Sequence, residues 1–222
     1  MEHKVKILQI NQITHDVKEF VVEKPEGYTF IPGQATVVSI NKLDLINEKR
    51  PFTFTSLKDN ENLEFVIKIY KEHNGVTAEL DNLEVGDELI INNPWGAIQY
   101  KGPGYFIAGG AGITPFIAIF RDLYRKNAID GNVLFFSNKT KGDIILEDEF
   151  ENMLDNNVLF TLTDEENRNY YQDMIDENFL RIHVKDFSKP FYICGPPAMT
   201  EQLTKTLEKL GASPDALVFE GK

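Results

Sequence analysis

The chain has 222 residues, enough for one large domain or for two domains of about a hundred residues each. Its formal net charge of −12 argues against nucleic acids and anionic membranes as partners, because both require a basic face. A single cysteine excludes an internal disulfide and an iron–sulfur cluster held by this chain alone, and the four histidines show no metal-ligand spacing.

The first hundred residues predict an all-β domain. Six short runs rich in β-branched and aromatic residues are separated by Pro, Gly, Asn and Asp. Their close spacing predicts a six-stranded antiparallel β-barrel that also contains one short helix, at 75–83. The predicted strands span residues 5–10, 19–23, 35–40, 50–56, 63–70 and 88–91.

From Lys101 onward, apolar strands alternate with helical stretches, which predicts an α/β nucleotide-binding domain built on a parallel sheet. A Gly-Pro-Gly sequence at 102–104 marks the boundary, so we expect domains at 1–101 and 102–222. The predicted strands are 105–108, 132–136, 158–162, 191–194 and 216–219, and the predicted helices are 115–126, 146–154, 172–181 and 198–210.

A glycine-rich turn at 109–115, Gly-Gly-Ala-Gly-Ile-Thr-Pro, follows the first strand of the second domain and opens its first helix. Glycines allow a backbone to approach a phosphate closely, and the amides of a helix N-terminus bind anions. Pro115 suits the first helical turn, where its missing N–H is not needed. Because the turn lies between a strand and a helix, we favour a dinucleotide pyrophosphate site over a tight turn without a ligand.

The segment Arg50-Pro-Phe-Thr-Phe-Thr-Ser56 can hold a flavin. A guanidinium suits a pyrophosphate, an aromatic side chain suits the face of the flavin ring, and a hydroxyl can bond a ring nitrogen. Strand alternation would place Arg50, Phe52, Phe54 and Ser56 on one side, with Thr53 and Thr55 on the other. Taken alone, the segment fits an ordinary strand with a surface arginine better than a flavin site.

Lys68 and Tyr70, followed by Gly75-Val76-Thr77 at a helix start, predict a second anion site made of side chains and helix amides. Thr77 also fits the role of helix-capping residue. Cys194-Gly195-Pro196-Pro197 ends a strand, and ligands of open α/β sheets bind at that end. A lone cysteine is more often a buried apolar group, but this position favours a functional one.

Taken together, these motifs resemble the ferredoxin–NADP reductase superfamily of two-domain flavoproteins, over nearly the whole chain. The matching segments are Phe30-x-Pro32-Gly33-Gln34, Arg50-x-Phe52-Thr53-x-x-Ser56, Gly75-Val76-Thr77, Gly110-x-Gly112-x-x-Pro115, Cys194-Gly195-Pro196-Pro197 and the final Phe219-Glu220-Gly221-Lys222. The resemblance, together with the second phosphate site, implies FAD as the flavin.

On the flavin side, the resemblance implies that Arg50 and Thr77 bind phosphates, that Phe52 stacks on the ring and that Thr53 bonds near N5. Ser56, Lys68, Tyr70, Gly75 and Val76 belong to the same predicted cofactor-binding set.

On the nicotinamide side, the resemblance implies that Thr114 helps to bind the pyrophosphate, with Gly110, Gly112, Pro115, Gly195 and Pro196 shaping the site. Cys194 would border the nicotinamide, Phe219 would cover the flavin face until the nicotinamide displaces it, and Glu220 would relay protons. Thr53, Cys194 and Glu220 are thus the predicted catalytic residues.

The choice between NADH and NADPH stays open. Ser137 and Lys139, after the second strand of the α/β domain, could hold a 2′-phosphate, and no acidic residue stands there to bind a ribose diol. The stretch Asn138-Lys139-Thr140-x-x-Asp143 is nevertheless similar to that of NADH-using cytochrome b5 reductases.

These features predict an FAD-dependent NAD(P)H oxidoreductase that passes hydride from nicotinamide to flavin and then single electrons to a separate acceptor, with ferredoxin or flavodoxin as the leading candidates. The alternatives are a free-flavin reductase and a non-catalytic electron-transfer subunit of a larger complex. No apolar run approaches the roughly 20 residues that span a bilayer, and the N-terminus does not resemble a signal peptide. We therefore expect a cytoplasmic protein.

Overall fold

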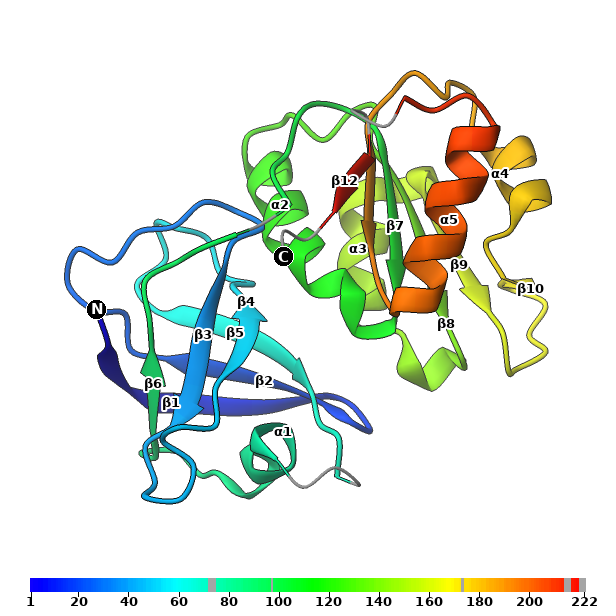
Figure 1. Cartoon of the computed structure of the whole chain (residues 1–222). Coiled ribbons are helices and arrows are strands. Elements are labelled where there is room, and N and C mark those ends of the chain that lie inside the picture. The colour runs from blue at the N-terminus through cyan, green and yellow to red at the C-terminus, as the bar shows by residue number, and fades with distance from the viewer. Residues whose placement is uncertain (72–74, 97, 173, 214–216, 220–222) are drawn as a thin grey trace.

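A computed structural model describes residues 1–222 except 72–74, 97, 173, 214–216 and 220–222. Within the described part of the chain the strands form two six-stranded sheets, one antiparallel and one parallel. Figure 1 shows the antiparallel sheet, built from the N-terminal half, beside the helix-covered parallel sheet of the C-terminal half. The predicted two-domain fold class is confirmed, with a barrel followed by an α/β domain.

The barrel sheet has the strand order β4-β3-β6-β1-β2-β5. The long first strand pairs with β2 along one edge and with β6 along the other, so that it bends around the core. Beyond the ladders, the Thr55 amide donates to the Glu64 carbonyl at 2.9 Å, which brings the two edge strands together. The strands are β1 (His3–Thr14), β2 (Val17–Val22), β3 (Ala35–Ile40), β4 (Arg50–Thr53), β5 (Leu63–Lys68) and β6 (Glu88–Ile91).

Aromatic rings fill the barrel. The Phe54 ring is fully buried, and its centroid lies 4.2 Å from that of Phe30 and 5.2 Å from that of Phe65. Helix α1 (Val76–Glu79) continues into the 3-10 turn Leu80–Asn82 and packs Val76 and Leu80 into the same core. The burial of these apolar side chains explains why runs of β-branched and aromatic residues located the six strands, although not all of their ends.

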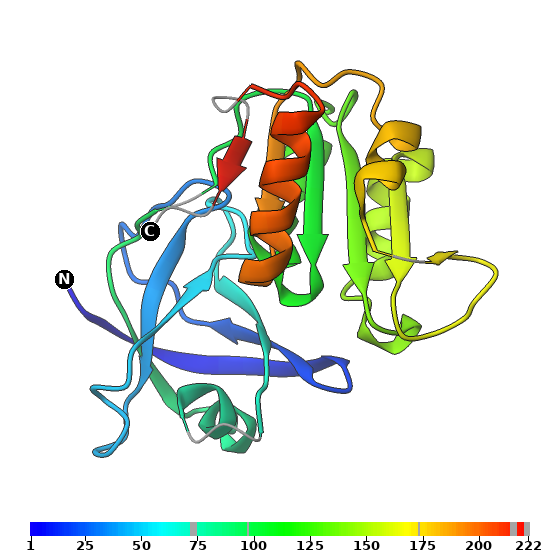
Figure 2. The ribbon, with the colours of Figure 1, turned by 45° about the vertical axis from the view of Figure 1, so that its right-hand side comes forward.

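The α/β domain has the strand order β10-β9-β8-β7-β11-β12, and all neighbouring strands are parallel. Helices α2 and α3 cover one face of the sheet, while α4 and α5 cover the other; Figure 2 shows α5 lying across its face. The strands are β7 (Tyr105–Gly109), β8 (Val133–Asn138), β9 (Val158–Leu162), β10 (Tyr171–Gln172), β11 (Phe191–Cys194) and β12 (Leu217–Phe219). The helices are α2 (Thr114–Arg125), α3 (Glu147–Leu154), α4 (Glu177–His183) and α5 (Pro197–Lys209).

Three local predictions were wrong. The helix predicted at 172–181 begins at Glu177, because Tyr171 and Gln172 instead pair with β9 and the Asp176 carboxylate caps the helix through the Phe179 amide at 2.8 Å. The strand predicted at 50–56 ends at Thr53. The cap of α1 is Gly75, without a side-chain hydrogen bond, rather than Thr77.

The two domains share apolar packing. Val17 and Val66 of the barrel belong to the same buried cluster as Phe116 and Phe120 of α2. Gly33 has φ +89°, and a side chain there would overlap the Ile98 carbonyl at 2.2 Å, so this position requires glycine. Among the described residues, no helix is both long and apolar enough to cross a membrane.

Candidate active site

A cleft of about 770 Å³ lies where the two domains meet. The barrel contributes residues from β4, β5 and α1, and the α/β domain contributes the turns after β7, β8 and β11. The sequence-predicted site residues that line it are Phe52, Thr53, Lys68, Tyr70, Thr77, Gly110, Gly112, Thr114, Ser137, Lys139, Cys194, Gly195 and Pro196. Segments separated by more than a hundred residues thus share one cavity, at the carboxyl ends of the parallel strands.

At the end of β4, Phe52 and Thr53 both line the cleft. Thr53 is buried and Phe52 half-buried. Phe54 lies in the barrel core and stacks on Phe30, and Phe52 packs against the edge of the same core, so these two rings share a side as the alternation predicts. An aromatic face and a hydroxyl therefore stand next to each other on the barrel wall.

Arg50 and Ser56, the two ends of the predicted flavin segment, are absent from the cleft lining. The Arg50 guanidinium is half-exposed; it donates to the Lys49 carbonyl at 2.8 Å and lies 3.8 Å from the Glu48 carboxylate. The Ser56 hydroxyl is buried and accepts a hydrogen bond from the Glu64 amide at 3.0 Å. The contacts of Ser56 support the link between the edges of the barrel, and its predicted cofactor role stays a prediction.

The second predicted anion site is only partly assembled. Lys68, Tyr70 and Thr77 line the cleft, but the Lys68 ammonium already lies 2.7 Å from the Asp16 carboxylate. Val76 points into the barrel core and offers only its backbone, and Gly75 precedes a helix of four residues. A phosphate at this place would compete with Asp16 for Lys68.

The glycine-rich turn combines two functions. Gly110 has φ +51° and open space where a side chain would lie, as a close approach of a ligand requires. At Gly112 a Cβ would lie 2.3 Å from the Cys194 carbonyl, so this glycine allows the turns after β7 and β11 to touch. Thr114 begins α2 and lines the cleft, and Pro115 is buried in the first helical turn behind it.

At the end of β11, Cys194 is 9 % exposed and lines the cleft with Gly195 and Pro196. A Cβ on Gly195 would lie 3.1 Å from the Gly109 amide nitrogen. This tight contact holds the Cys194 segment against the glycine-rich turn. Cys194 thus lies across the cleft from the barrel wall. Phe219 forms part of β12, whereas Glu220 lies outside the described residues.

Ser137 and Lys139 flank Asn138, which belongs to the cytochrome b5 reductase-like stretch but was not among the predicted site residues. Asn138 is 5 % exposed and lines the cleft, and neither atom of its side-chain amide has a hydrogen-bond partner within the described part of the protein. A buried amide without partners is costly, so a polar ligand that reached it would be stabilised. This observation fits the binding of a nucleotide on this wall.

An acidic group does lie beside the end of β8, although not in its sequence. The Asp164 amide, just after β9, donates to the Lys139 carbonyl at 2.9 Å, and the Glu165 carboxylate accepts from the Lys141 amide at 2.8 Å. Parallel pairing of β8 with β9 produces this placement, which the sequence of the β8 turn alone could not reveal.

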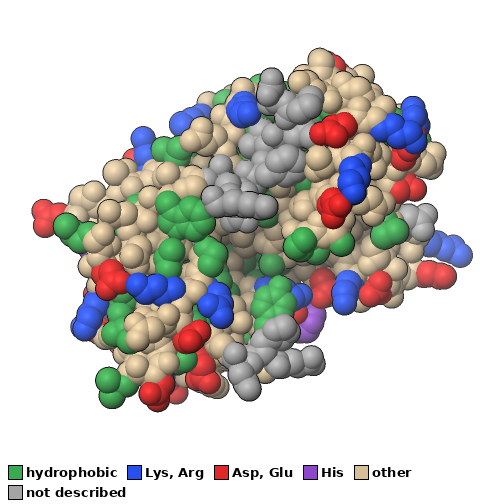
Figure 3. Space-filling view, viewed as in Figure 1, with side chains coloured by type: hydrophobic (Ala, Val, Ile, Leu, Met, Phe, Trp, Pro, Cys, Tyr) green, Lys and Arg blue, Asp and Glu red, His purple; other side chains and the backbone are tan. Residues whose placement is uncertain are grey.

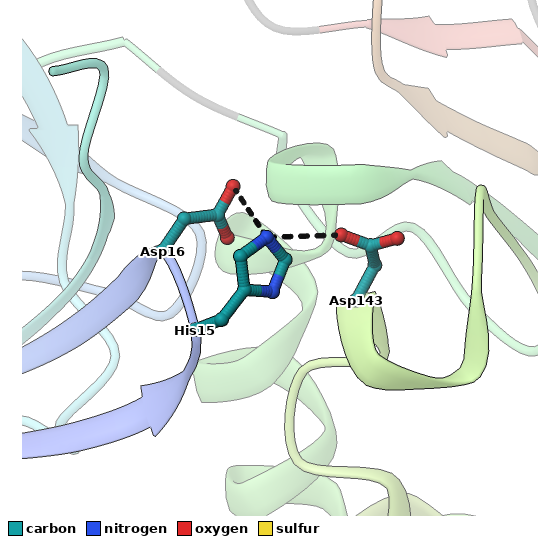
Figure 4. A group of neighbouring side chains, drawn as sticks. All are labelled: His15, Asp16 and Asp143. Carbon is teal, nitrogen blue, oxygen red and sulfur yellow. Dashed lines mark ion pairs between the residues drawn. The ribbon is translucent and has the colours of Figure 1, made fainter.

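One cluster joins the two domains at the cleft (Figure 4). His15 lies between two carboxylates, with its Nε2 3.6 Å from Asp16 and 3.9 Å from Asp143. Burial by itself raises the pKa of Asp143, but hydrogen bonds from the Thr140 hydroxyl and amide, with nearby Lys68 and His15, lower this pKa by more. Since Lys68 already pairs with Asp16, we interpret the cluster as an ion-pair contact rather than a metal site.

The fold and the cleft define a two-domain oxidoreductase that binds two dinucleotide cofactors. Residues 4–100 match the oxidoreductase FAD-binding domain family, and residues 106–205 match the oxidoreductase NAD-binding domain family. The chain thus combines an FAD-binding and an NAD-binding oxidoreductase domain, so it is an FAD- and NAD(P)-binding flavoprotein oxidoreductase, and it has the ferredoxin–NADP reductase-like fold that its motifs predicted.

Several relatives resemble the chain over most of its length. NADH–cytochrome b5 reductase 1 of Arabidopsis thaliana is 29% identical over 95% of this chain and 80% of that protein. NADH nitrate reductase of Cucurbita maxima is also 29% identical, over 92% of this chain but only 26% of its own length. The chain thus spans about a quarter of that nitrate reductase.

Solved structures share the fold. A ferredoxin NADP⁺ reductase from Neisseria gonorrhoeae with bound FAD and NADP superimposes with a TM-score of 0.87 at 20% identity, over 99% of this chain and 98% of that one. The CS-b5R domains of human Ncb5or in the NAD⁺ form superimpose with a TM-score of 0.85 at 25% identity, over 100% of this chain and 70% of that one.

Proposed function

We propose that the chain takes hydride from NADH onto FAD and delivers the electrons singly to a separate protein. The observation that carries this proposal is the shared cleft, in which Phe52 and Thr53 of the barrel and Cys194 and Gly195 of the α/β domain line one cavity. When the two cofactors are bound, they supply the redox chemistry themselves, and the protein supplies position and electrostatics.

The barrel wall holds the flavin in this proposal. Phe52 packs against the ring, and the buried Thr53 hydroxyl bonds near N5, where the hydride arrives. Arg50 and Thr77 bind the phosphates, which requires the Arg50 side chain to leave its surface contacts with Lys49 and Glu48. Those contacts are exposed and weak, so exchanging them for a phosphate costs little.

The α/β wall holds the nicotinamide dinucleotide. Gly110 and Thr114 bind the pyrophosphate, the Asn138 amide gains the polar partner that it lacks, and Cys194 borders the nicotinamide. The NADH preference in this proposal rests on the stretch Asn138-Lys139-Thr140-x-x-Asp143, which is similar to that of NADH-using cytochrome b5 reductases. The NADH-specific names of the relatives support the same preference.

The electron acceptor is a separate one-electron carrier. Ferredoxin and flavodoxin were the candidates from sequence, and the relatives named for cytochrome b5 add that haem protein. The mixed distribution of Lys, Arg, Asp and Glu over the face in Figure 3 does not select among them. The cytoplasmic location stays a prediction.

The test is an anaerobic titration of the purified protein, in which the visible flavin band is followed as NADH and NADPH are added separately. We expect a yellow protein that NADH bleaches at a concentration at least tenfold below that of NADPH. A colourless protein that reduces added flavin would instead identify a free-flavin reductase. A yellow protein that neither nicotinamide bleaches would contradict the proposal in favour of an accessory subunit.

The acceptor is tested in the same preparation, by mixing the NADH-reduced protein with cytochrome b5, ferredoxin or flavodoxin and following the acceptor's own spectrum. The acceptor that belongs to the physiological class of electron carrier should be reduced at least tenfold faster than the other two acceptors. Equal slow rates with all three would show that the acceptor is a different kind of protein.

A further inference from the structure

Arg121 is the most highly connected charged residue at the domain interface. It projects from α2, and its side chain is 20 % exposed. Its Nη1 donates to the Thr55 carbonyl at 2.9 Å and to the Glu64 carboxylate at 2.5 Å. Its Nε and Nη2 donate to the two oxygens of the Glu149 carboxylate at 2.5 and 2.9 Å. One guanidinium therefore binds the barrel and the α/β domain at the same time.

Arg121 and its partners lie close along the chain to residues of both walls of the cleft. On the barrel side, Thr55 follows Thr53 by two residues, and its hydroxyl donates to the same Glu64 carboxylate at 2.8 Å. On the other side, α2 begins at Thr114 in the cleft, seven residues or about 10 Å of helix before Arg121. A short strand end and a rigid helix thus connect the guanidinium to the two places where the cofactors are held.

The other contacts that join the domains are apolar or exposed, and these include the 3.9 Å contact between the exposed His15 ring and Asp143. Val17 and Val66 pack against α2 through apolar surface, which is not directional. Arg125, one turn further along α2, makes an exposed ion pair with Asp59 at 3.0 Å. Arg125 also reaches both domains, but through the single exposed Nη2 that contacts Asp59 and Asp122. The Arg121 guanidinium instead donates from three nitrogens, with a two-bond fork to Glu149 and further bonds to the barrel, a planar geometry that resists rotation as well as separation.

We propose that Arg121 is a positioning residue that sets the separation and tilt of the flavin and nicotinamide sites. The inference rests on the hydride transfer of the proposed function, which needs the two rings in near-attack geometry. A displacement of about 1 Å far from the reacting atoms can slow such a reaction about a hundredfold. A substitution at position 121 should therefore change the rate of hydride transfer more than the affinity for either cofactor.

Loss of the guanidinium would also leave carboxylates facing one another. Glu64 and Glu149 would lose their shared partner, and Glu19 lies close enough that its pKa is raised, first by burial and further by Glu64 and Glu149. Repulsion between these groups across the interface would open the angle between the domains. Lysine at 121 would restore the positive charge but not the forked hydrogen bonds.

The test compares Arg121→Met and Arg121→Lys with the control Arg125→Met, which removes the neighbouring exposed ion pair. Each flavin-loaded protein is mixed anaerobically with excess NADH in a stopped-flow instrument. The limiting rate of flavin reduction, the apparent dissociation constant for NADH, and the nicotinamide–flavin charge-transfer absorbance are measured. We expect both Arg121 variants to reduce flavin 10- to 100-fold more slowly, with a weaker charge-transfer band and a dissociation constant within threefold of wild type.

Arg125→Met should stay within twofold of wild type in all three readouts. If Arg121→Met does not fold with flavin, Glu149→Gln, which keeps one oxygen acceptor, serves instead and should slow reduction about threefold to tenfold.

Limiting rates within twofold of wild type in the flavin-loaded Arg121 variants would overturn the inference while leaving the proposed function intact, and so would full rescue by lysine. A wild-type protein that neither nicotinamide reduces would overturn the proposed function, and the inference with it.

Discussion

The barrel wall and the α/β wall of the cleft are built in different ways. The barrel wall presents side chains, such as Phe52, Thr53 and Lys68, on strands whose backbone is fixed elsewhere. The α/β wall consists largely of turns, in which Gly112 and Gly195 fit against neighbouring backbone with no room for a Cβ. Side chains on the first wall can be exchanged without moving the fold, whereas changes in the turns of the second wall move the fold itself.

The difference separates binding from stability. On the barrel wall, a substitution should weaken one cofactor contact and leave the free energy of unfolding almost unchanged. On the α/β wall, a substitution at a turn should change stability, nicotinamide binding and the position of Cys194 together. The following substitutions test this contrast, from the largest expected effect to the smallest.

Gly112→Ala should have the largest effect, because the new Cβ would lie 2.3 Å from the Cys194 carbonyl and would force the two turns apart. We expect a loss of about 3 kcal/mol in the free energy of unfolding, measured by urea denaturation. The control is Gly142→Ala, where the nearest atom to the Cβ is the Thr140 hydroxyl at 3.7 Å, and which should change stability by less than about 0.5 kcal/mol. Equal stability of the two variants would show that the turns are not constrained.

Cys194→Ala removes a side chain from the α/β wall but leaves the backbone contact with Gly112 in place. We expect the limiting rate of flavin reduction by nicotinamide to fall about tenfold, equivalent to about 1.4 kcal/mol, because the nicotinamide is less well positioned. Flavin occupancy, read from the visible absorbance, should stay at the wild-type level. An unchanged reduction rate would assign Cys194 to packing alone.

Arg50→Ala tests the barrel wall. The exposed guanidinium contacts only Lys49 and Glu48 among the described residues, so unfolding should be almost unaffected. Flavin retention should weaken about fivefold, or about 1 kcal/mol, as expected for one exposed charge-assisted phosphate bond. Lys49→Ala, which removes the neighbouring ion pair with Glu2, is the matched control and should retain flavin normally. Full flavin occupancy after dialysis of Arg50→Ala would contradict the assignment.

Asp143→Asn should have the smallest effect, a loss of about 0.5 kcal/mol at pH 7, because the Asp143 carboxylate accepts hydrogen bonds from the Thr140 amide and hydroxyl in the capping box of this turn. The folded-state pKa of Asp143 is lowered, so its stabilisation is present above the unfolded pKa and is lost as pH falls through the folded value. The difference between wild type and variant should therefore shrink below about pH 4. Urea unfolding at pH 3 and pH 7, with exposed Asp130→Asn as control, checks this; a difference that does not change with pH would refute it.

Local sequence signals predicted the elements that carry the site. The strand-turn-helix pattern around Gly110 and Pro115 depends on neighbours within a few residues, and the structure forms it as predicted. The start of α4 was misplaced because helical periodicity was extended over Tyr171 and Gln172, although Asp176 gave a capping signal that could have corrected it.

Residues that act through distant partners could not be predicted from sequence in the same way. Arg121 reads as one of several charged residues on an amphipathic helix, and its importance depends on Thr55 and Glu64, more than fifty residues earlier. Asp164 reaches the turn after β8 only because β8 and β9 are parallel neighbours. Asn138 stands out through its lack of hydrogen-bond partners, which no sequence pattern records.

The barrel's ladders also have a consequence for how the chain is made. All six strands of the barrel, β1 through β6, lie within residues 3–91. Their ladders can therefore form before α2 leaves the ribosome. Translation at about 5–20 residues per second leaves a delay of a few seconds between the two events. During that time the nascent barrel presents Glu19 and Glu64 without the cation that later separates them from Glu149. A barrel that closes first would present Glu64 to the second domain, and Arg121 would be the group that pairs with this carboxylate when the second domain docks.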